Sequence, residues 1–560
     1  MGVPRFFSWV NNNYSVIIDS IIKPHEFYFD LNCLLHPKCF EIAGEVLKEN
    51  PSYDLDKNKD KLEAKMFAKI IEYMEEILDY IQPTDLIYIA IDGVAPMAKM
   101  KHQRLRRFKS VKEQEIRNEI LAAHKNPILQ KWSNSVITPG TNFMKKLAII
   151  LLKFSKEYKP KYQEKNISII LSTSNTHGEG EHKVHQYLKE QNIKTIQEGT
   201  SYNKIKVVYG LDADLLFLTM ATQIPKLYVF REAVHIDEKS TKKFLMVDMD
   251  LLKSGIFEEI QSKTEKELDI NHVINDYIVM GFLLGNDFLP NIPSLTLSPI
   301  HYKIENGLDI LLKVYPEFIK DNDYISTNSN NIIKFIGLLA NLEENHFKTV
   351  YQRGRITQKT NETDPCKLAL FQFDNLTLSD VNFLNLGKDE SKLYKKRYYN
   401  YFFPKMHVNQ ICKEYVEGLS WVKHYYLNDC ADWLWLYKHH QAPFISDIYQ
   451  YLLSNPVPEI KVLDNKYSIK PLEQLMMVIP PEFANILPIE CRSIFKNSNL
   501  KKYFPQDYDF DIFMKTKFWM AYPEIPNPNY ADFMKEITKI KLSEESEKLN
   551  KNFKPIEIKN

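Results

Sequence analysis

Cysteine is scarce in this sequence, and no two cysteines stand in a CxxC pair. The six that occur are dispersed over 560 residues: Cys33, Cys39, Cys366, Cys412, Cys430 and Cys491. This pattern argues against a disulfide framework or a thiolate zinc site and indicates a reducing compartment. Glycine is sparse as well, with 16 residues, which excludes collagen-like and glycine-rich repeat architectures.

Long apolar runs and an excess of one charge are also missing. Residues 147–152 and 277–284 form apolar stretches far shorter than the roughly 20 residues of a membrane-spanning helix. No secretory leader is expected, so the sequence predicts a soluble protein of the cytoplasm, with the nucleus not excluded. Lys plus Arg (73) nearly balances Asp plus Glu (72), so attraction for a polyanion must come from local clusters of charge.

The first part of the chain alternates short β-rich runs with helical patterns. Apolar, β-branched or aromatic runs predict strands at 27–29, 86–91, 167–171, 205–209, 227–230 and 244–247. The patterns between them predict helices that include 61–80, 142–158 and 182–190. This alternation is typical of an α/β domain with a central, mostly parallel sheet, here residues 1–344.

Three further segments follow this domain. Residues 345–400 are polar and mixed and predict a connector. Residues 401–540 are aromatic-rich and predict a second, mainly helical region. Residues 541–560 are rich in Lys and Glu and predict a solvated or frayed tail.

Acidic residues follow several of the predicted strands and one apolar helix. They are Asp30, Asp92, Glu179, Glu181, Asp212, Asp214 and Asp287. Side chains of parallel strands that share an edge can meet there, and seven carboxylates in one place require cations. Hard oxygen donors favour Mg²⁺, with Mn²⁺ as a substitute, and two such ions about 4 Å apart can drive phosphodiester hydrolysis. The alternative is that each acid merely caps a helix or turn, and the sequence alone does not decide between these readings.

A run of cations begins shortly after Asp92. No acid occurs between Gly93 and Lys112, and Pro96 can open a helix. On that helix Lys99, Gln103, Arg106 and Arg107 fall within about 100° of one another and share a face. Such a face predicts a pocket for a terminal phosphate, although a solvated basic helix is the common alternative.

The motifs, taken in order, resemble the XRN family of 5′→3′ exoribonucleases. They are Met1-Gly2-Val3-Pro4-Arg5-Phe6-Phe7, Phe29-Asp30-Leu31-Asn32, Ile91-Asp92-Gly93-Val94-Ala95-Pro96, Ile137-Thr138-Pro139-Gly140-Thr141, Gly178-Glu179-Gly180-Glu181-His182-Lys183, Gly210-Leu211-Asp212-Ala213-Asp214-Leu215 and Gly285-Asn286-Asp287-Phe288-Leu289-Pro290. The similarity resumes at 415–422 and 442–447, so it covers most of the chain.

The resemblance implies a PIN/FEN-like nuclease domain in which the seven acids bind Mg²⁺. It also implies that Lys99, Gln103, Arg106 and Arg107 hold a 5′-monophosphate, and that His36 and Trp421 stack on the terminal base. Met97 departs from the family, which usually has Arg at this position. The chain looks like a compact catalytic core, and its many Lys, Asn and Ile residues with little Gly hint at an AT-rich viral or protist genome.

We therefore expect a processive, monomeric 5′→3′ exoribonuclease. It would degrade 5′-monophosphorylated single-stranded RNA to nucleoside 5′-monophosphates in mRNA decay, downstream of a decapping enzyme. Two alternatives remain open at this stage: a flap endonuclease acting on DNA, because the acidic cluster alone fits that superfamily, and an inactive scaffold that binds RNA ends.

Overall fold

The computed structural model describes residues 6–128, 131–161, 167–200, 202–233, 243–297, 305–353, 360–376, 384, 393–458 and 460–559. Its centre is an eight-stranded sheet with the order β1-β7-β6-β5-β2-β3-β4-β10. The five strands from β6 to β4 are parallel to one another, whereas β1, β7 and β10 join antiparallel at the two edges. The predicted α/β fold with a mostly parallel sheet is confirmed.

The strands are short, as expected for a buried sheet. Their bounds are β1 (Ile17–Ile18), β2 (Glu26–Asp30), β3 (Leu86–Ala90), β4 (Ser168–Ser172), β5 (Lys206–Tyr209), β6 (Leu227–Glu232), β7 (Phe244–Asp248) and β10 (Ile556–Lys559). A separate small hairpin pairs β8 (Phe510–Asp511) with β9 (Tyr522–Pro523). Strands β2 to β7 lie where the sequence predicts them.

Helices surround the sheet and build the second region. Those up to the end of the sheet-forming part are α1 (Phe6–Asn13), α2 (Asn32–Glu49), α3 (Lys59–Ile81), α4 (Met97–Ala123), α5 (Asn142–Glu157), α6 (Gly180–Gln197), α7 (Asp214–Ala221), α8 (Met249–Gln261) and α9 (Ile270–Gly281). The later ones are α10 (Gly307–Asp321), α11 (Ser329–Arg353), α12 (Pro365–Asp374), α13 (Tyr394–Phe402), α14 (Val408–Leu427), α15 (Ile445–Ser454), α16 (Pro471–Val478), α17 (Tyr530–Ile537) and α18 (Glu544–Leu549). Short 3₁₀ helices complete the later region, which is mainly helical as predicted.

Both faces of the sheet are covered, as the alternation of side chains along each strand requires. Phe27 and Phe29 of β2 pack with residues of α2, α3 and α5 on one face. Tyr28 points to the opposite face, into a cluster that includes residues of α6 and α7. Two apolar layers therefore fix the sheet between helices.

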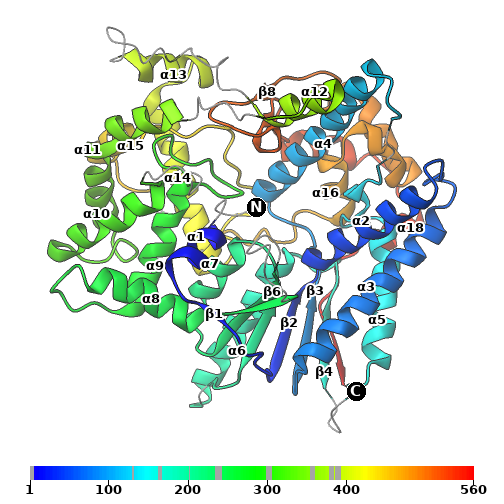
Figure 1. Cartoon of the computed structure of the whole chain (residues 1–560), viewed down its shortest axis with the longest axis horizontal. Helices are drawn as coiled ribbons and strands as arrows, with labels where there is room; N and C mark the ends of the chain where they lie inside the picture. Colours follow the sequence, from blue (N-terminus) through cyan, green and yellow to red (C-terminus); the bar gives the residue numbers. More distant parts are fainter. Residues whose placement is uncertain are drawn as a thin grey trace.

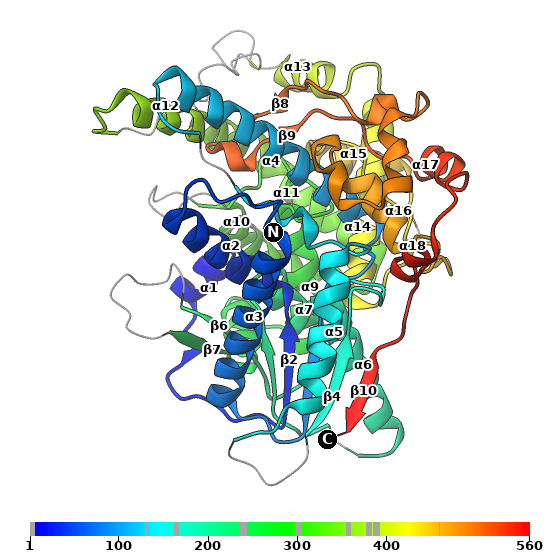
Figure 2. The same cartoon turned by 90° about the vertical axis from the view of Figure 1, so that its right-hand side faces the viewer.

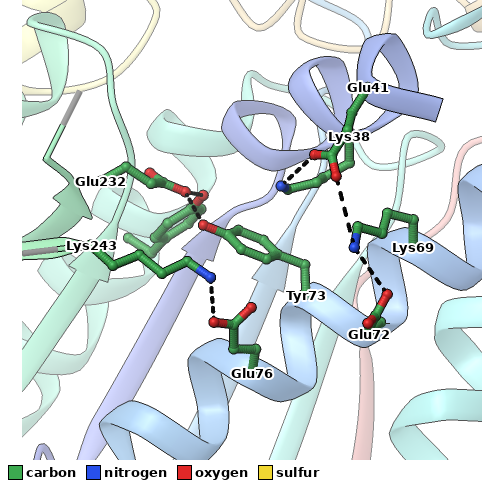
Figure 3. Close-up of polar contacts among 9 residues, drawn as sticks. Lys38, Glu41, Lys69, Glu72, Tyr73, Glu76, Glu232 and Lys243 are labelled. Carbon is green, nitrogen blue, oxygen red and sulfur yellow. Dashed lines mark hydrogen bonds and ion pairs between the residues drawn. The ribbon is translucent and has the colours of Figure 1, made fainter. Parts of the chain in front are cut away.

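Polar contacts tie α3 to the β6–β7 side of the sheet and to α2 (Figure 3). The Tyr73 hydroxyl donates to Glu232 Oε1 at 2.9 Å, and Lys243 forms an ion pair with Glu76. On the outer side, Lys69 lies between Glu72 at 3.2 Å and Glu41 at 3.7 Å. These surface contacts add little energy individually, and the buried layers hold the helices in place.

The second region lies over the carboxyl ends of the parallel strands. In Figure 2 the arrowhead of β2 points upward, toward α4, α14 and α16. The first amide of α4, Met97 N–H, donates to the Trp433 carbonyl at 2.8 Å, and Ala95 N–H donates to Gln474 Oε1 at 2.9 Å. The helix that begins after Asp92 is thus anchored to the second region at its start.

The last residues differ from the prediction of a solvated tail. Residues Glu544–Leu549 form α18, and Ile556–Lys559 form β10, which pairs antiparallel with β4 (Figures 1 and 2). The physical reason is the unpaired edge that β4 would otherwise present, which accepts the alternating Ile556-Glu557-Ile558-Lys559 segment. A Lys- and Glu-rich composition alone did not reveal this pairing.

The connector contains α12 and α13, and much of it lies outside the described residues. The predicted domain boundaries remain predictions. Within the described part of the chain, no helix combines the length and the apolar character needed to cross a membrane.

Candidate active site

The carboxyl ends of three neighbouring strands place acidic residues along one edge of the sheet. Asp30 ends β2, Asp92 follows β3, and Asp212 follows β5. Because β5, β2 and β3 are adjacent and parallel, these acids leave the sheet on the same side. This is the edge at which open α/β sheets bind their ligands.

Gly180 brings the start of α6 against this edge. Its N–H donates to Asp92 Oδ1 at 2.7 Å. A Cβ at this position would lie 2.6 Å from Asp30 Oδ1 and 3.4 Å from Asp92 Oδ1. Only glycine therefore lets the helix approach so closely, and Glu179 and Glu181 enter the same acidic cluster on either side of it.

Lys99 lies between two of the carboxylates. Its ammonium forms an ion pair with Glu179 and another, at 2.8 Å, with Asp287. The Tyr425 hydroxyl donates to Glu179 Oε1 at 2.8 Å, and His102 Nδ1 is 3.3 Å from Asp287 Oδ2. Although burial opposes its charge, Asp287 and Glu179 hold the pKa of Lys99 well above its usual range.

Burial and mutual repulsion disfavour the charged forms of most of the remaining acids. Burial and the neighbouring Asp92 raise the pKa of Asp30 to about 8. Burial and Asp287 raise the pKa of Asp214 to about 7, and burial with nearby acids raises that of Glu181 well above its usual range. Asp287 is the exception, because His102 and Lys99 outweigh its burial and hold its pKa well below the usual range. Neighbouring carboxyl groups whose pKa values are shifted in opposite directions are typical of functional sites.

Three buried oxygens in this cluster have no hydrogen-bond partner in the described part of the chain. They are Asp30 Oδ1, Glu181 Oε2 and Asp214 Oδ1. Unpaired hard oxygens fit a divalent cation such as Mg²⁺. Among the described residues, however, no three acidic, His or Cys side chains are already set around one point as metal ligands. The donor chemistry therefore fits Mg²⁺, while Lys99 supplies the positive charge between Glu179 and Asp287.

The predicted phosphate-binding residues divide into two groups. Lys99 faces the acids, whereas Gln103, Arg106 and Arg107 lie farther along α4. Arg107 Nη2 donates to Thr138 Oγ1 at 2.7 Å, and Gln103 Oε1 accepts from Gln474 Nε2 at 3.2 Å. Arg106 is exposed and makes no hydrogen bond or ion pair with the described residues. The guanidinium groups of Arg107, which is hydrogen-bonded to Thr138, and of Arg106, which is exposed to solvent, can together bind an anion.

His36 of α2 lies close to these two arginines. Its ring is half-buried, and Nδ1 is 3.2 Å from Asn134 Nδ2. Burial, followed by the charges of Arg106 and Arg107, lowers the pKa of His36 to about 4, so the ring is neutral at physiological pH. A neutral ring at this place is compatible with the stacking role that the resemblance implies.

Trp421 is not exposed in the way that a stacking residue requires. It is fully buried, and its ring stacks on Tyr425 at 4.9 Å and on Trp435 at 4.7 Å between centroids. Its Nε1–H donates to the Asp432 carbonyl at 2.9 Å. Aromatic packing has covered the faces of this indole, and the half-buried Trp435 is the ring of the stack nearer the surface.

Sequence reasoning missed the cations on the other side of α4. Lys101 Nζ donates to the carbonyls of Tyr437 at 2.7 Å and His439 at 3.0 Å. Arg104, 1% exposed, donates to the carbonyls of Met477, at 2.8 Å, and Tyr503. These residues fasten the helix to the second region, and their spacing of three places them together on a separate face. Met97 is 1% exposed in an apolar cluster, where a cation would need a partner.

Comparison with known proteins accounts for nearly the whole chain. A family model described as "XRN 5′-3′ exonuclease N-terminus" matches residues 1–233. A second, described as "Xrn1 helical domain", matches residues 267–384 and 379–557. The chain belongs to the XRN family. The α/β part up to β6 thus corresponds to the XRN N-terminal model, and the helical part, with Asp287, to the helical-domain model.

Named relatives are identical to this chain at about one residue in four. The human "5′-3′ exoribonuclease 1" is 27% identical over 94% of this chain and 33% of its own length. The chicken "5′-3′ exoribonuclease 2" is 26% identical over 94% of this chain and 68% of its own length. The Saccharomyces cerevisiae "5′-3′ exoribonuclease 1" is 26% identical over 93% and 42%, respectively. The chain spans about a third to two-thirds of the length of these relatives.

Proposed function

We propose that this XRN-family chain is a 5′→3′ exoribonuclease that removes nucleoside 5′-monophosphates, one after another, from 5′-monophosphorylated single-stranded RNA. The observation that carries the proposal is the pairing of two sites by one helix. Helix α4 starts beside the carboxylates and carries Arg106 and Arg107 farther along. Lys99 and Arg106 are seven residues apart, about 10 Å along the helix, so one helix reaches both the carboxylates and the arginines.

In this proposal the arginines hold the terminal phosphate of the RNA. Arg106 is open to solvent, and Arg107 is oriented by Thr138 and Gln103. Fork-shaped guanidinium donors bind phosphate oxygens in pairs, so the end of the strand is fixed in register with the acids. A capped or triphosphorylated end adds bulk and charge that a single-phosphate pocket rejects.

The seven acids are the proposed ligands of Mg²⁺ or Mn²⁺: Asp30, Asp92, Glu179, Glu181, Asp212, Asp214 and Asp287. When bound, two such ions would activate a water molecule and stabilise the leaving oxygen. The chain's own groups prepare the site. Tyr425 and Lys99 orient Glu179, Gly180 N–H orients Asp92, and the second region covers the edge of the sheet. His36 and Trp435, the half-buried ring that stacks on the buried Trp421, are the proposed contacts for the first base.

The proposed place of the enzyme in the cell rests on the 5′-monophosphate end of its RNA substrate. A monophosphate end on a messenger RNA must be made by another reaction, such as decapping, so we place the enzyme downstream of that step in cytoplasmic mRNA decay. We expect it to act as a monomer, since the proposed site is built within one chain. Light scattering of the purified protein and the location of a tagged copy test these two statements.

The deciding experiment uses one RNA sequence with a 5′-monophosphate, a 5′-triphosphate or a cap, with and without Mg²⁺. We expect mononucleotides only from the monophosphate form and only with the metal. Intact RNA under these conditions would instead support a scaffold that binds RNA ends. A labelled 5′-flap DNA assayed in parallel tests the endonuclease alternative, which requires cleavage at the junction.

A further inference from the structure

A cavity of about 770 Å³ opens between helices of the first domain and of the second region, on the face of α14 opposite Tyr425. Its walls come from α9 and the 3₁₀ helix that follows it (Phe282–Leu284), from the start of α11, from α14, and from the segment after α15. Most of the lining side chains are apolar, among them Met280, Phe282, Ile336, Val416, Leu419 and Leu452. This size and lining are typical of sites for small organic ligands.

One cation stands in this apolar lining. Lys423 is half-buried, and its Nζ donates to the Ser326 carbonyl at 2.6 Å. An ammonium group has three donors, so two remain for another acceptor. Lys423 has no ion-pair partner among the described residues, and none of the described lining residues is acidic.

Asp276 is the buried acid whose charge acts on Lys423, and it already accepts several hydrogen bonds. Asp276 accepts from the Tyr315 hydroxyl at 2.6 Å and from the backbone N–H groups of Ile325, at 2.7 Å, and Ser326, at 2.6 Å. Its oxygens thereby fix the 325–326 turn that presents the Ser326 carbonyl to Lys423. Asp276 thus helps to position the Lys423 ammonium without forming an ion pair with it. The ammonium can therefore pair with a negatively charged group of a ligand in the cavity.

We propose that this cavity binds a small amphipathic anion of the fatty-acid class, with its apolar chain in the cavity and its carboxylate on Lys423. The apolar walls match a hydrocarbon chain, and the lone cation in an acid-free lining matches the acidic head group. A neutral hydrocarbon of the same length would leave the ammonium without a partner.

The place of the cavity relates it to the active site. Helix α14 forms one of its walls and also carries Tyr425, whose hydroxyl donates to Glu179 at 2.8 Å. The Phe282–Leu284 turn, a second wall, leads directly to Asp287. A ligand there fills a space behind two elements that hold catalytic carboxylates, so its binding is expected to stabilise the folded protein.

The test is displacement of the fluorescent apolar anion 1-anilinonaphthalene-8-sulfonate from the full chain by dodecanoate or by dodecanol. We expect dodecanoate to bind about tenfold or more tightly than dodecanol and to raise the Tm, because a charge-assisted contact distinguishes the two. Lys423→Met should weaken dodecanoate about tenfold and leave dodecanol unchanged. Lys413→Met, on the same helix beside Glu417, is the matched control and should change neither.

A second variant separates loss of binding from loss of folding. Ser420→Phe adds a ring at the wall of the cavity on α14 and should reduce the binding of both probes while Lys423 remains. Equal binding of dodecanoate and dodecanol to the native protein would overturn the proposal. Unchanged dodecanoate affinity in a folded Lys423→Met protein would do so too. Neither result bears on the exonuclease, which is assayed separately with 5′-monophosphorylated RNA.

Discussion

Arg106 is the residue through which the phosphate pocket can be tested with the least disturbance of the fold. It is exposed and has no partner among the described residues, so its loss should not destabilise the protein. We expect Arg106→Gln to lower kcat/KM on 5′-monophosphorylated RNA by about ten- to a hundredfold, the worth of a charge-assisted contact. Activity on 5′-hydroxyl RNA should stay the same, so the preference between the two ends is the quantity to measure.

Arg117→Gln supplies the control for this experiment, because Arg117 lies on the same helix and pairs with Glu113 and Asp374 instead. It should keep the native preference. An unchanged preference for the monophosphate end in Arg106→Gln would remove the argument for the pocket.

Asp30 makes the stability of the metal-free protein depend on pH. Its pKa is raised from 3.8 to about 8 by burial and by Asp92, so the unfolded chain releases this proton before the folded protein does. The contribution to stability is complete below about pH 4, declines as the pH rises, and is fully lost above about pH 8. Asp30→Asn should therefore raise the stability of the metal-free protein at pH 8 by about 1–3 kcal/mol and abolish nuclease turnover.

Thermal melts of the metal-free protein at pH 5 and pH 8 measure this effect. The difference between the wild-type protein and Asp30→Asn isolates Asp30 from Glu181 and Asp214. Asp212→Asn, at an exposed position, removes only a smaller contribution to the raised pKa of Asp30 and should stabilise the protein at pH 8 less than Asp30→Asn does. If Asp30→Asn has the same Tm as the wild-type protein at pH 8, the ionised Asp30 carboxylate does not destabilise the folded protein.

Residue types and spacing predicted which side chains gather at the site but not what each one touches. The strand ends were enough to bring Asp30, Asp92 and Asp212 to one edge, because parallel neighbours end on the same side. Lys99 shares a helical face with Arg106, yet its ammonium lies on Glu179 and Asp287, which come from distant segments. Trp421 was expected to stack on the terminal base, but the rings that cover it follow from tertiary packing alone.

At the scale of elements, α4 joins the two halves of the molecule through its buried face. The Arg104 guanidinium donates to two carbonyls of the second region and lies over the rings of Phe108, at 4.4 Å, and Phe504, at 5.2 Å. Arg104→Met leaves those carbonyls without donors, so we expect a loss of about 3 kcal/mol in unfolding free energy. Urea unfolding followed by fluorescence measures it.

Arg117→Met is the comparison on the same helix and should cost about 1 kcal/mol or less, because its ion pairs are partly exposed. Equal losses in the two variants would mean that α4 is not anchored through Arg104. The sequence predicted that a helix starts at Pro96 and placed Lys99, Gln103, Arg106 and Arg107 on one face, but it gave no role to Arg104. Every residue has a backbone carbonyl, so a sequence does not show which carbonyls accept hydrogen bonds from a side chain. The face of α4 that carries Lys101 and Arg104 could therefore not be predicted to anchor the helix.

At the scale of the whole molecule, the chain returns to its first domain after building the second. The core strands could be predicted because each is a local apolar run. Strand β10 could not, since it is short, follows a charged segment, and pairs with β4 nearly 400 residues earlier. The same return links the end of the chain to the loop before Glu179.

That link leads to a prediction about residues 551–560. The Phe553 N–H donates to the Asn175 carbonyl at 2.9 Å, Thr176 Oγ1 donates to the Phe553 carbonyl at 3.0 Å, and Asn175 Nδ2 donates to the Lys551 carbonyl at 2.7 Å. A chain that stops at Asn550 loses these bonds together with the β4–β10 pairing. We expect a lower Tm and stronger aggregation, because the edge of β4 is exposed.

The same truncation should also reduce exonuclease activity, because the 173–178 loop sets the position of Glu179 and is held on one side by these residues. Measuring Tm and kcat together separates the two effects, and Lys554→Ala, at an exposed position of the same segment, is the full-length control and should change neither. Native kcat in a truncated protein that still folds at the assay temperature would mean that the sheet edge and the active site are independent. A fall in kcat at a temperature well below the lowered Tm would instead show that the last residues help to position Glu179 through the 173–178 loop.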